Sequence, residues 1–192
     1  MIDREVLNGG LKVYGIDATP EMAERFDIYI NMLIEWNKKI NLTSITDPEE
    51  ILVKHFFDSI SCVQSNVISP GNRVIDVGTG AGFPGLPLKI AMPDLKLTLL
   101  DSLNKRVLFL NELVEKLGLK ADIIHGRAED YGLKKDFRES FDVVLSRAVA
   151  PLNVLSEYTI PFARVGGFVL CQKGPAVFEE IKDSQNAIDV LG

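Results

Sequence analysis

The sequence feature that most constrains the fold of this chain is an apolar run that contains a carboxylate and leads into a glycine-rich turn. The run and the turn read Val74-Ile75-Asp76-Val77-Gly78-Thr79-Gly80-Ala81-Gly82-Phe83-Pro84-Gly85. The apolar run predicts a buried strand, and the glycines lack the Cβ atoms that would keep a ligand away from the backbone. The pattern indicates a strand, a turn and a helix start suited to a nucleotide-like ligand.

Two classes of cofactor use such a turn. Residues 80–85 fit the dinucleotide pattern G-x-G-x-x-G, and Asp101 lies near the offset expected for the acid that binds ribose hydroxyls. Residues 76–82 resemble instead the D-x-G-x-G-x-G turn of S-adenosylmethionine-dependent methyltransferases. We favour the second interpretation, because a carboxylate on the strand tip would repel a pyrophosphate and suits the ammonium of a methionine tail. The predicted cofactor is S-adenosyl-L-methionine, and the residues of the turn predicted to bind it are Asp76, Gly78, Gly80 and Gly82.

Length and composition exclude several classes of protein. A chain of 192 residues can form one α/β domain with an extension, and its apolar runs fall short of the roughly 18 to 20 residues of a membrane span. We expect a cytoplasmic monomer with no membrane partner. The two cysteines and two histidines show no metal-ligand spacing, so we expect no metal. A net charge of -6 argues against wholesale coating of nucleic acid but leaves room for a local basic cleft.

Hydrophobic spacing divides the chain near residue 72. Before this point apolar residues recur at helical steps, with one helix predicted after Thr19-Pro20 and another after Asp47-Pro48. After it short apolar runs alternate with helical segments, which predicts an α/β fold with a doubly wound, mostly parallel sheet. We expect an N-terminal helical extension over residues 1–72 and a methyltransferase-type core over residues 73–192. The predicted strands are 74–77, 95–100, 122–124, 141–146 and 167–171, and the predicted core helices are 85–91, 104–117 and 153–162, with one more after residue 175.

Candidate residues lie at the carboxyl ends of the predicted strands, where ligands bind in such sheets. Asp101 ends the second strand and either accepts from ribose hydroxyls or caps the next helix. Glu129, next to Ala128, follows the third strand and could accept from the exocyclic amine of an adenine. Arg147 ends the fourth strand, and its planar fork suits a carboxylate, a phosphate or a guanine edge. Cys171 ends the fifth strand, and we interpret it as a strand thiol rather than as a nucleophile.

Several motifs in order resemble the bacterial glucose-inhibited division protein B family, the small-subunit ribosomal RNA guanine-N7 methyltransferases G. They span nearly the whole chain and are Trp36-Asn37 with Asn41-Leu42-Thr43, His55 with Asp58-Ser59, Asp76 through Gly85, Lys105-Arg106 with Phe109-Leu110, Arg127-Ala128-Glu129, Ser146-Arg147-Ala148 and Lys173-Gly174. The resemblance implies a cofactor site of Gly78, Phe83, Ala128, Glu129 and Arg147, with Asp101 where the family usually has glutamate. Family members usually continue with two further strands, so we expect the last two strands of a seven-stranded sheet to be absent.

The resemblance also implies a function, the methylation of guanine N7 in 16S ribosomal RNA by S-adenosyl-L-methionine. Guanine N7 carries a lone pair and no hydrogen, so in-line attack on a sulfonium methyl needs no general base. The sequence agrees, since it shows no obvious acid and base pair. We expect Arg147 to be the catalytic residue that positions cofactor or guanine. The residues expected to hold phosphates of the RNA or of the small ribosomal subunit are Lys38, Lys39, Lys54, His55, Arg106 and Lys173.

Three alternatives of other classes stay open at this point. A methyltransferase that acts on a small molecule or a protein would share the cofactor site. An NAD-dependent oxidoreductase would use the same turn for a dinucleotide, which Asp76 disfavours. An RNA-binding factor without catalytic activity would bind RNA and leave it unmethylated.

Overall fold

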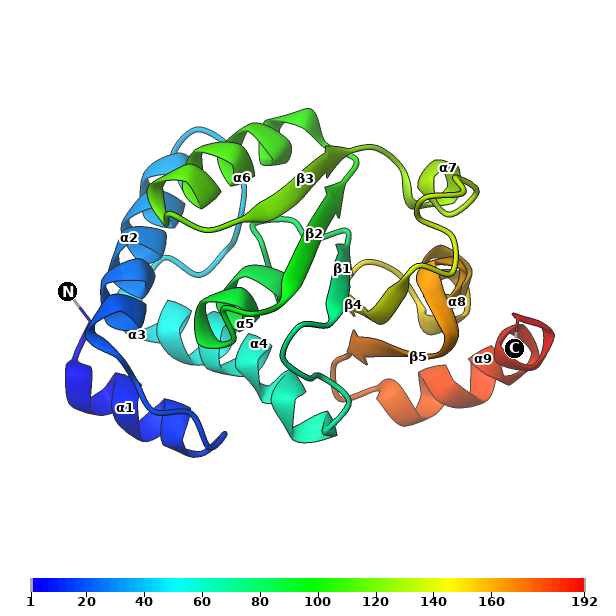
Figure 1. Ribbon diagram of the computed structural model, residues 1–192, viewed down its shortest axis with the longest axis horizontal. Helices are drawn as coiled ribbons and strands as arrows, with labels where there is room; N and C mark the ends of the chain where they lie inside the picture. The colour runs from blue at the N-terminus through cyan, green and yellow to red at the C-terminus, as the bar shows by residue number, and fades with distance from the viewer. Residues whose placement is uncertain (1, 192) are drawn as a thin grey trace.

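A single sheet of five parallel strands forms the centre of the structure, a computed structural model that describes residues 2–191 (Figure 1). The strands are β1 (Arg73–Val77), β2 (Lys96–Asp101), β3 (Ala121–His125), β4 (Phe141–Arg147) and β5 (Ala163–Gln172). Their order across the sheet is β3-β2-β1-β4-β5, and each neighbouring pair is parallel. The predicted doubly wound sheet is confirmed. The one marked difference is that β5 begins at Ala163 rather than at residue 167.

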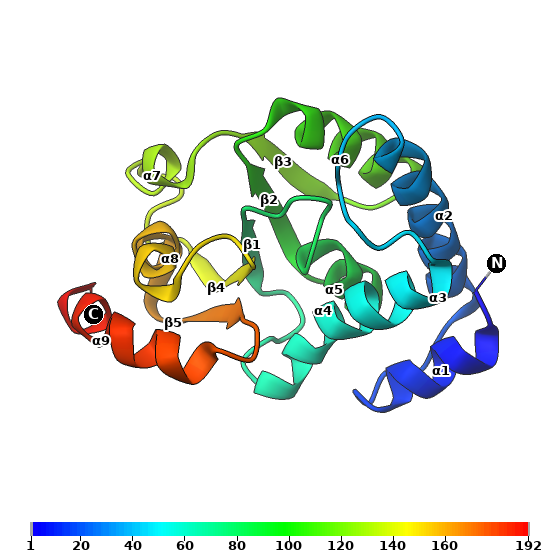
Figure 2. The same cartoon turned by 180° about the vertical axis from the view of Figure 1, so that it is seen from behind.

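Helices cover both faces of this sheet (Figures 1 and 2). The helical elements are α1 (Arg4–Lys12), α2 (Pro20–Asn37), α3 (Pro48–Ile51), a π-helical turn (Leu52–Phe57), α4 (Asp58–Ile60), a 3-10 turn (Ser61–Ser65), α5 (Gly85–Ala91), α6 (Asn104–Lys116), α7 (Ala128–Tyr131), α8 (Leu152–Thr159), a second 3-10 turn (Ile160–Phe162) and α9 (Val177–Leu191). α2, α5 and α6 pack together on one face, α7 and α8 lie on the other, and α9 packs against α8. Within residues 2–191 none of the helices has the length and apolar character that a bilayer span requires.

The central strand β1 is buried on both faces. Val74 belongs to the larger apolar cluster, beneath α2, α5 and α6, whereas Ile75 and Val77 belong to the smaller cluster on the opposite face. Successive side chains of a strand point to opposite faces, so a strand covered on both sides is apolar at consecutive positions. This explains why the apolar run in the sequence shows no alternation.

The direction of winding changes between β1 and β4. From β1 the chain passes through α5 to β2 and then to β3 on one side, whereas β4 pairs with the other side of β1. The connections that leave these two neighbouring strands therefore diverge. In sheets of this type a crevice opens at that point, beyond the carboxyl ends of the strands.

The N-terminal extension shares one hydrophobic cluster with the core. Buried residues of α1, α2 and the π-helical turn pack together with those of α5, α6 and the sheet. Tyr29 on α2 stacks on Phe83 with ring centroids 5.5 Å apart, and its hydroxyl donates to the carbonyl oxygen of Ala81 at 2.6 Å. The extension thus touches the glycine-rich turn itself. The division of the chain at residue 72 remains a prediction.

The first helix was not predicted from the sequence, and its segment contains two adjacent glycines. Gly9 and Gly10 lower helix propensity and are typical of turns. The structure gives the physical reason for one of them, since a Cβ on Gly10 would lie 2.1 Å from the ring of Phe57. Asp3 starts the helix by accepting from the N–H groups of Glu5 and Val6. Close packing against the extension therefore outweighs the weak local propensity.

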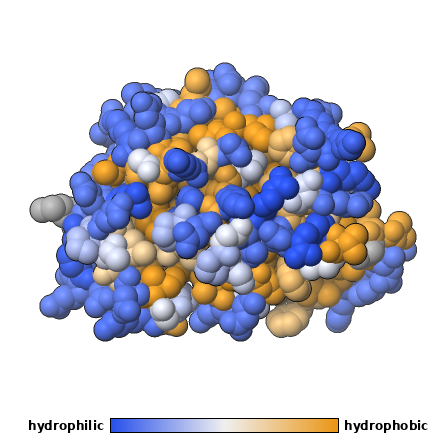
Figure 3. All heavy atoms as spheres, in the orientation of Figure 1, coloured by the Kyte–Doolittle hydropathy of each residue, from blue (hydrophilic) through white to orange (hydrophobic). Residues whose placement is uncertain are grey.

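The edge of the sheet at β5 carries exposed apolar side chains. In Figure 3 orange atoms gather at the lower right, over the region of β5 and α9. The exposed large apolar residues of these two elements are Val165, Phe168, Phe178, Ile181 and Val190. The sheet of the described residues ends at this strand.

Candidate active site

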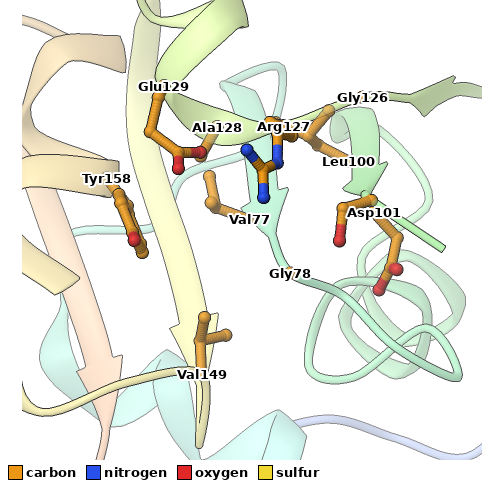
Figure 4. A pocket seen from close by; sticks show the side chains of 11 residues that line it. Val77, Gly78, Leu100, Asp101, Gly126, Arg127, Ala128, Glu129, Val149 and Tyr158 are labelled. Carbon is orange, nitrogen blue, oxygen red and sulfur yellow. The ribbon is translucent and has the colours of Figure 1, made fainter. Parts of the chain in front are cut away.

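Two adjoining cavities form a cleft over the carboxyl ends of β1, β2 and β4. The first has a volume of about 210 Å³ and is lined by Val77, Gly78, Leu100, Asp101, Ser102, Gly126, Arg127, Ala128, Glu129, Val149 and Tyr158 (Figure 4). The second has a volume of about 410 Å³ and is lined by Leu42, Thr43, His55, Gly78, Thr79, Gly80, Ala81, Phe83, Asp101, Ser102, Arg106, Arg147, Ala148 and Val149. Residues 78, 101, 102 and 149 line both cavities, so the two are ends of one elongated site.

The glycine-rich turn forms the floor of the cleft. Gly78, Gly80 and Gly82 have φ angles of 70°, 63° and 99°, in the region that side chains of L-residues disfavour. A Cβ on Gly78 would lie 2.6 Å from a methyl group of Val149, so this glycine also lets the loop after β4 approach the turn. The N–H of Gly80 donates to the carboxylate of Asp101 at 2.8 Å. The backbone of the turn therefore requires glycine.

Asp76 shapes this turn from below and does not line the cleft. Its side chain is fully buried. Its Oδ2 accepts from the Thr79 hydroxyl at 2.7 Å and from the N–H of Gly85 at 2.8 Å, whereas its Oδ1 has no hydrogen-bond partner. Burial raises the pKa of Asp76 to about 6, although the two hydrogen bonds and the charge of Arg147 act in the opposite direction. The expected direct contact with a methionine ammonium has no support in this geometry, because protein atoms cover the carboxylate.

Asp101 and Glu129 lie on opposite sides of the first cavity (Figure 4). Asp101 is 2% exposed, and its Oδ1 accepts the N–H of Leu103 at 2.8 Å. Both interpretations of Asp101 hold in part, because it fixes the turn before α6 and also lines the cavity. Glu129 is exposed at the start of α7, with Ala128 beside it on the cavity wall.

Arg147, at the end of β4, lies in the second cavity and is held by three contacts. Its Nη1 donates to Oδ2 of Asp58 at 2.9 Å, and its Nη2 lies 3.3 Å from Nδ1 of His55. The guanidinium carbon lies 4.8 Å from the centroid of the Phe83 ring, which is a cation–π contact. Arg147 is thus brought together with the predicted residues Phe83 and His55.

His55 is part of the cleft rather than of an exposed basic surface. Its Nε2 lies 2.7 Å from the Thr43 hydroxyl, and its ring stacks on Phe83 at 4.7 Å. Burial lowers the pKa of His55 to about 4, and the neighbouring charge of Arg147 acts in the same direction. Because Arg147 can only donate, Nδ1 of His55 must accept and Nε2 must carry the proton. The imidazole is therefore neutral and is a poor partner for an RNA phosphate, contrary to expectation.

The other residues expected to hold phosphates differ in their surroundings. Lys39 and Arg106 line a groove of about 580 Å³, which we call the basic groove; its lining residues are Lys39, Ile40, Asn41, Leu103, Asn104, Lys105 and Arg106. Arg106 also lines the second cavity, so the groove adjoins the cleft. Lys38 precedes Lys39 at the end of α2, and Lys54 pairs with Glu50 at 2.5 Å on the surface.

Lys173 was expected to face solvent, but the structure buries its side chain. Its side chain is 8% exposed, and its ammonium pairs with Glu180 at 2.7 Å and donates to the Ala150 carbonyl at 2.7 Å. These contacts tie the loop after β4 to α9. An ammonium held inside the protein in this way is not available to a phosphate, so we withdraw Lys173 as an RNA contact.

Several lining residues were not predicted from the sequence. Tyr158 lies on α8, and no spacing rule relates that segment to the glycine-rich turn. Thr43 lies in the loop after α2, within the motif Asn41-Leu42-Thr43, to which no role was assigned from the sequence. Val149 follows the end of β4, and this position alone is a signal that could have identified it. Cys171 is not among the lining residues, and burial raises its pKa to about 11, which agrees with its interpretation as an unreactive thiol.

Two solved structures that share this fold are SAM-dependent methyltransferases. The fold matches a SAM-dependent methyltransferase from Aquifex aeolicus with a TM-score of 0.54 and 22% identity, over 79% of this chain and 87% of that one. It also matches a SAM-dependent methyltransferase from Geobacter sulfurreducens in complex with S-adenosyl-L-homocysteine, with a TM-score of 0.50 and 21% identity, over 62% of this chain and 50% of that one. The predicted methyltransferase-type fold is confirmed.

Sequence relatives identify the family. The family model of GidB, described as rRNA small subunit methyltransferase G, matches residues 22–192. The chain is 52% identical over 193 residues to the ribosomal RNA small subunit methyltransferase G of Alkaliphilus metalliredigens strain QYMF, covering 100% of this chain and 81% of the relative. The corresponding protein of Desulforamulus reducens is 52% identical over 187 residues, covering 97% and 78%. These matches confirm the predicted family, the predicted rRNA methyltransferase activity and the predicted cofactor, S-adenosyl-L-methionine. The chain belongs to the GidB family of rRNA small subunit methyltransferase G.

Proposed function

We propose that this protein transfers the methyl group of S-adenosyl-L-methionine to N7 of a guanine in 16S ribosomal RNA, by direct in-line attack without a general base. The observation that carries the proposal is the state of His55. Both of its ring nitrogens are bonded within the protein and its pKa is lowered to about 4, so it is a poor base. Guanine N7 has a free lone pair and needs none. We further propose that the protein acts in the cytoplasm as a monomer and without a metal.

The residues of the first cavity fit the cofactor. A side chain at Gly78 would intrude at the junction of the two cavities, where a ligand that occupies both must pass. A carboxylate has about four acceptor positions, and Asp101 uses three of them within the protein, so it can still accept from a ribose hydroxyl. Glu129 lines the same cavity as Val77 and Leu100, and it would accept from the amine of an adenine that packs against these two residues. S-adenosyl-L-methionine bound here supplies an electrophilic sulfonium methyl.

The residues proposed to bind the cofactor therefore divide into two groups. Those that contact it are Gly78, Gly80, Asp101, Ala128, Glu129 and Arg147, whereas Gly82 lines neither cavity and belongs to the second group. Asp76 and Phe83 act through other residues, because Asp76 holds the turn and Phe83 supports the guanidinium of Arg147.

Arg147 is proposed to be the catalytic residue that orients the reacting partners. A guanidinium can bind guanine through both O6 and N7. In this reaction N7 must keep its lone pair free for attack, so Arg147 can contact the base only through O6, or it holds the carboxylate of the methionine tail. In either case it contributes orientation rather than proton transfer.

The RNA substrate is proposed to enter from the basic groove. The major groove of A-form RNA is deep and narrow, so a guanine N7 inside a duplex is out of reach and the base must leave its stack. Lys38, Lys39 and Arg106 would hold phosphates next to the cleft, together with Lys105. For RNA binding, we expect Lys39→Ala to reduce the slope of the logarithm of the binding constant against the logarithm of the salt concentration by about one. Lys173→Ala should leave this slope unchanged. Equal slopes in both variants would exclude the groove as the RNA path.

The direct test is a labelling experiment. The protein is incubated with methyl-labelled S-adenosyl-L-methionine and small ribosomal subunits from cells that lack the activity, and the RNA is then digested to nucleosides. We expect labelled N7-methylguanosine. A different labelled nucleoside would refute the proposed specificity, and RNA binding without any label would favour the alternative of an RNA-binding factor without catalysis.

The role of Arg147 has its own control. Arg147→Ala should reduce kcat by about a hundredfold or more while the melting curve stays close to that of the unmodified protein, because the residue lies at a strand end and not in the core. Unchanged turnover would remove Arg147 from the mechanism.

A further inference from the structure

We propose that His55 and Asp58, both from the N-terminal extension, are positioning residues that hold the guanidinium of Arg147 in its reactive orientation. The inference rests on the proposed function only for what Arg147 does to the substrate. It gives the extension a part in the active site, whereas the sequence assigned His55 to RNA phosphates and assigned no role to Asp58.

The contacts on Arg147 fix the guanidinium in three directions. Asp58 receives Nη1–H at 2.9 Å and His55 faces Nη2 at 3.3 Å, so two different nitrogens are held in the plane of the group. Phe83 lies under one face, 4.8 Å from the guanidinium carbon. A guanidinium has five N–H donors, so three remain for a ligand. Because the group is planar, fixing two donors also fixes the directions of the others.

His55 is itself held from its far side. Its Nε2–H donates to the Thr43 hydroxyl at 2.7 Å. Thr43 is in turn fixed by Asn37 at the end of α2, whose side chain donates to the Thr43 carbonyl at 2.9 Å and accepts the Thr43 N–H at 3.0 Å. A continuous set of hydrogen bonds therefore runs from α2 through His55 to Arg147. The imidazole has no freedom to rotate without breaking one of these bonds.

Asp58 is anchored to the sheet by its backbone as well as by its carboxylate. Its carbonyl oxygen accepts from Nε2 of Gln172 at 2.6 Å, and Gln172 is the residue paired with Arg147 in the register of β4 and β5. His55 lies in the π-helical turn and Asp58 directly follows it. Such turns alter the usual helical spacing of side chains and occur frequently at functional sites. Here the turn presents both residues to the end of β4.

An ion pair on a protein surface would not by itself suggest a function. The pair of Arg147 and Asp58 differs from such a surface pair in two ways. The Arg147 side chain is only 16% exposed, whereas that of Asp58 is 48% exposed. The neutral ring of His55 and the aromatic face of Phe83 also contact the same guanidinium. Three separate side chains thus contact one guanidinium in the cleft. This is the form of support that positions a group for reaction.

Two substitutions of His55 separate its two hydrogen bonds. In His55→Asn an amide oxygen lies where Nδ1 was and can still accept from Arg147, whereas His55→Gln reaches toward Thr43 and loses the acceptor near Arg147. Both variants lose the ring that stacks on Phe83, so this loss cancels in the comparison. We expect kcat of the Gln variant to be about tenfold lower than that of the Asn variant, with KM for RNA within about threefold. Equal kcat values would refute the proposal.

Asp58 provides the second comparison. Asp58→Asn keeps an acceptor and loses the charge, whereas Asp58→Ala loses both, so kcat should fall from the unmodified protein to Asn and further to Ala. Glu24→Gln removes an exposed carboxylate from the same extension, on α2, and serves as the control that leaves kcat unchanged. An Ala variant as active as this control would also refute the positioning role.

A measurement without substrate separates this inference from the proposed function. Side-chain ¹⁵N spectra of the free protein, assigned with His125→Gln, should show His55 as the neutral Nε2–H form at about pH 5.5, and Asp58→Ala should shift the Arg147 side-chain signals. Imidazolium at that pH, or unchanged Arg147 signals, would overturn the arrangement even if methylation is observed. If methylation fails but these signals are found, the proposed function is wrong and the arrangement stands.

Discussion

Replacing Asp76 by asparagine should remove a pH-dependent loss of stability. The carboxylate is fully buried, its Oδ1 has no partner, and burial raises its pKa from 3.8 to about 6. Because the pKa of this acid is higher in the folded chain than in the unfolded chain, the folded state binds the proton more tightly. Stability therefore falls as the pH rises from about 4 to about 6 and stays lower above that range. An amide in the same place does not titrate.

The size of the effect follows from the change in pKa. A rise from 3.8 to about 6 corresponds to about 3 kcal/mol of lost stability at neutral pH. About half of this loss has already occurred at pH 5, so the stability of Asp76→Asn relative to the unmodified protein should increase by about 1.4 kcal/mol between about pH 5 and about pH 7.5. The amide oxygen can still accept from Thr79 and Gly85, and the amide nitrogen in place of the partnerless Oδ1 adds only an offset that is independent of pH.

Urea unfolding of both proteins at the two pH values measures this difference directly. A constant difference in stability would show that the carboxylate of Asp76 does not have a raised pKa in the folded state, and the account of the turn would then be wrong. The same variant decides between two roles for Asp76. If Asp76 only supports the turn from its buried position, the affinity for S-adenosyl-L-methionine should change by less than about threefold. If Asp76 contacts the ammonium directly, the affinity should fall by at least about tenfold.

Two further predictions concern the extension. Gly9→Ala should stabilise α1 by about 0.5 to 1 kcal/mol, because open space surrounds its Cβ position, whereas Gly10→Ala should destabilise the protein by about 1 to 3 kcal/mol, because the new methyl would meet the Phe57 ring. Thermal melts of both variants test this, and shifts of equal sign would contradict it. Tyr29→Phe leaves the buried carbonyl of Ala81 without its donor and should cost about 1 to 3 kcal/mol in urea unfolding; a loss below about 0.5 kcal/mol would mean that this bond contributes little.

The fold could be predicted from the sequence because its signals are local. The alternation of apolar runs with helical spacing after residue 72 predicted all five strands and the helices between them, except the short α7 between β3 and β4. The glycine-rich turn and Asp101 could be assigned to one site because the ends of neighbouring parallel strands meet at one edge of the sheet. The same reasoning placed Glu129 and Arg147 at the cleft. In each case the position of a residue relative to a strand end was enough.

Contacts between distant segments could not be predicted in this way. A lysine after a strand end looks the same in the sequence whether it faces solvent or is buried. The side chain of Lys173 is buried, and it pairs with Glu180, seven residues further along, on the helix that packs beside it. His55 was assigned to RNA because its neighbours include lysine, yet the structure turns its ring toward Arg147, 92 residues away. Charge and burial at such positions depend on tertiary packing, which local patterns do not contain.

The glycine-rich turn is held in the free protein by groups that come from three different parts of the chain. Its backbone is tied to Asp101 on β2, to Tyr29 on α2 and to Asp76 on β1. Binding a ligand to this turn should therefore require little further loss of backbone conformational entropy. The amide protons of the turn should exchange slowly with solvent before any ligand is added. Ligand association should be a single step, with an observed rate that rises linearly with ligand concentration. The cleft would then select its ligand by shape that exists in advance, rather than by folding around it.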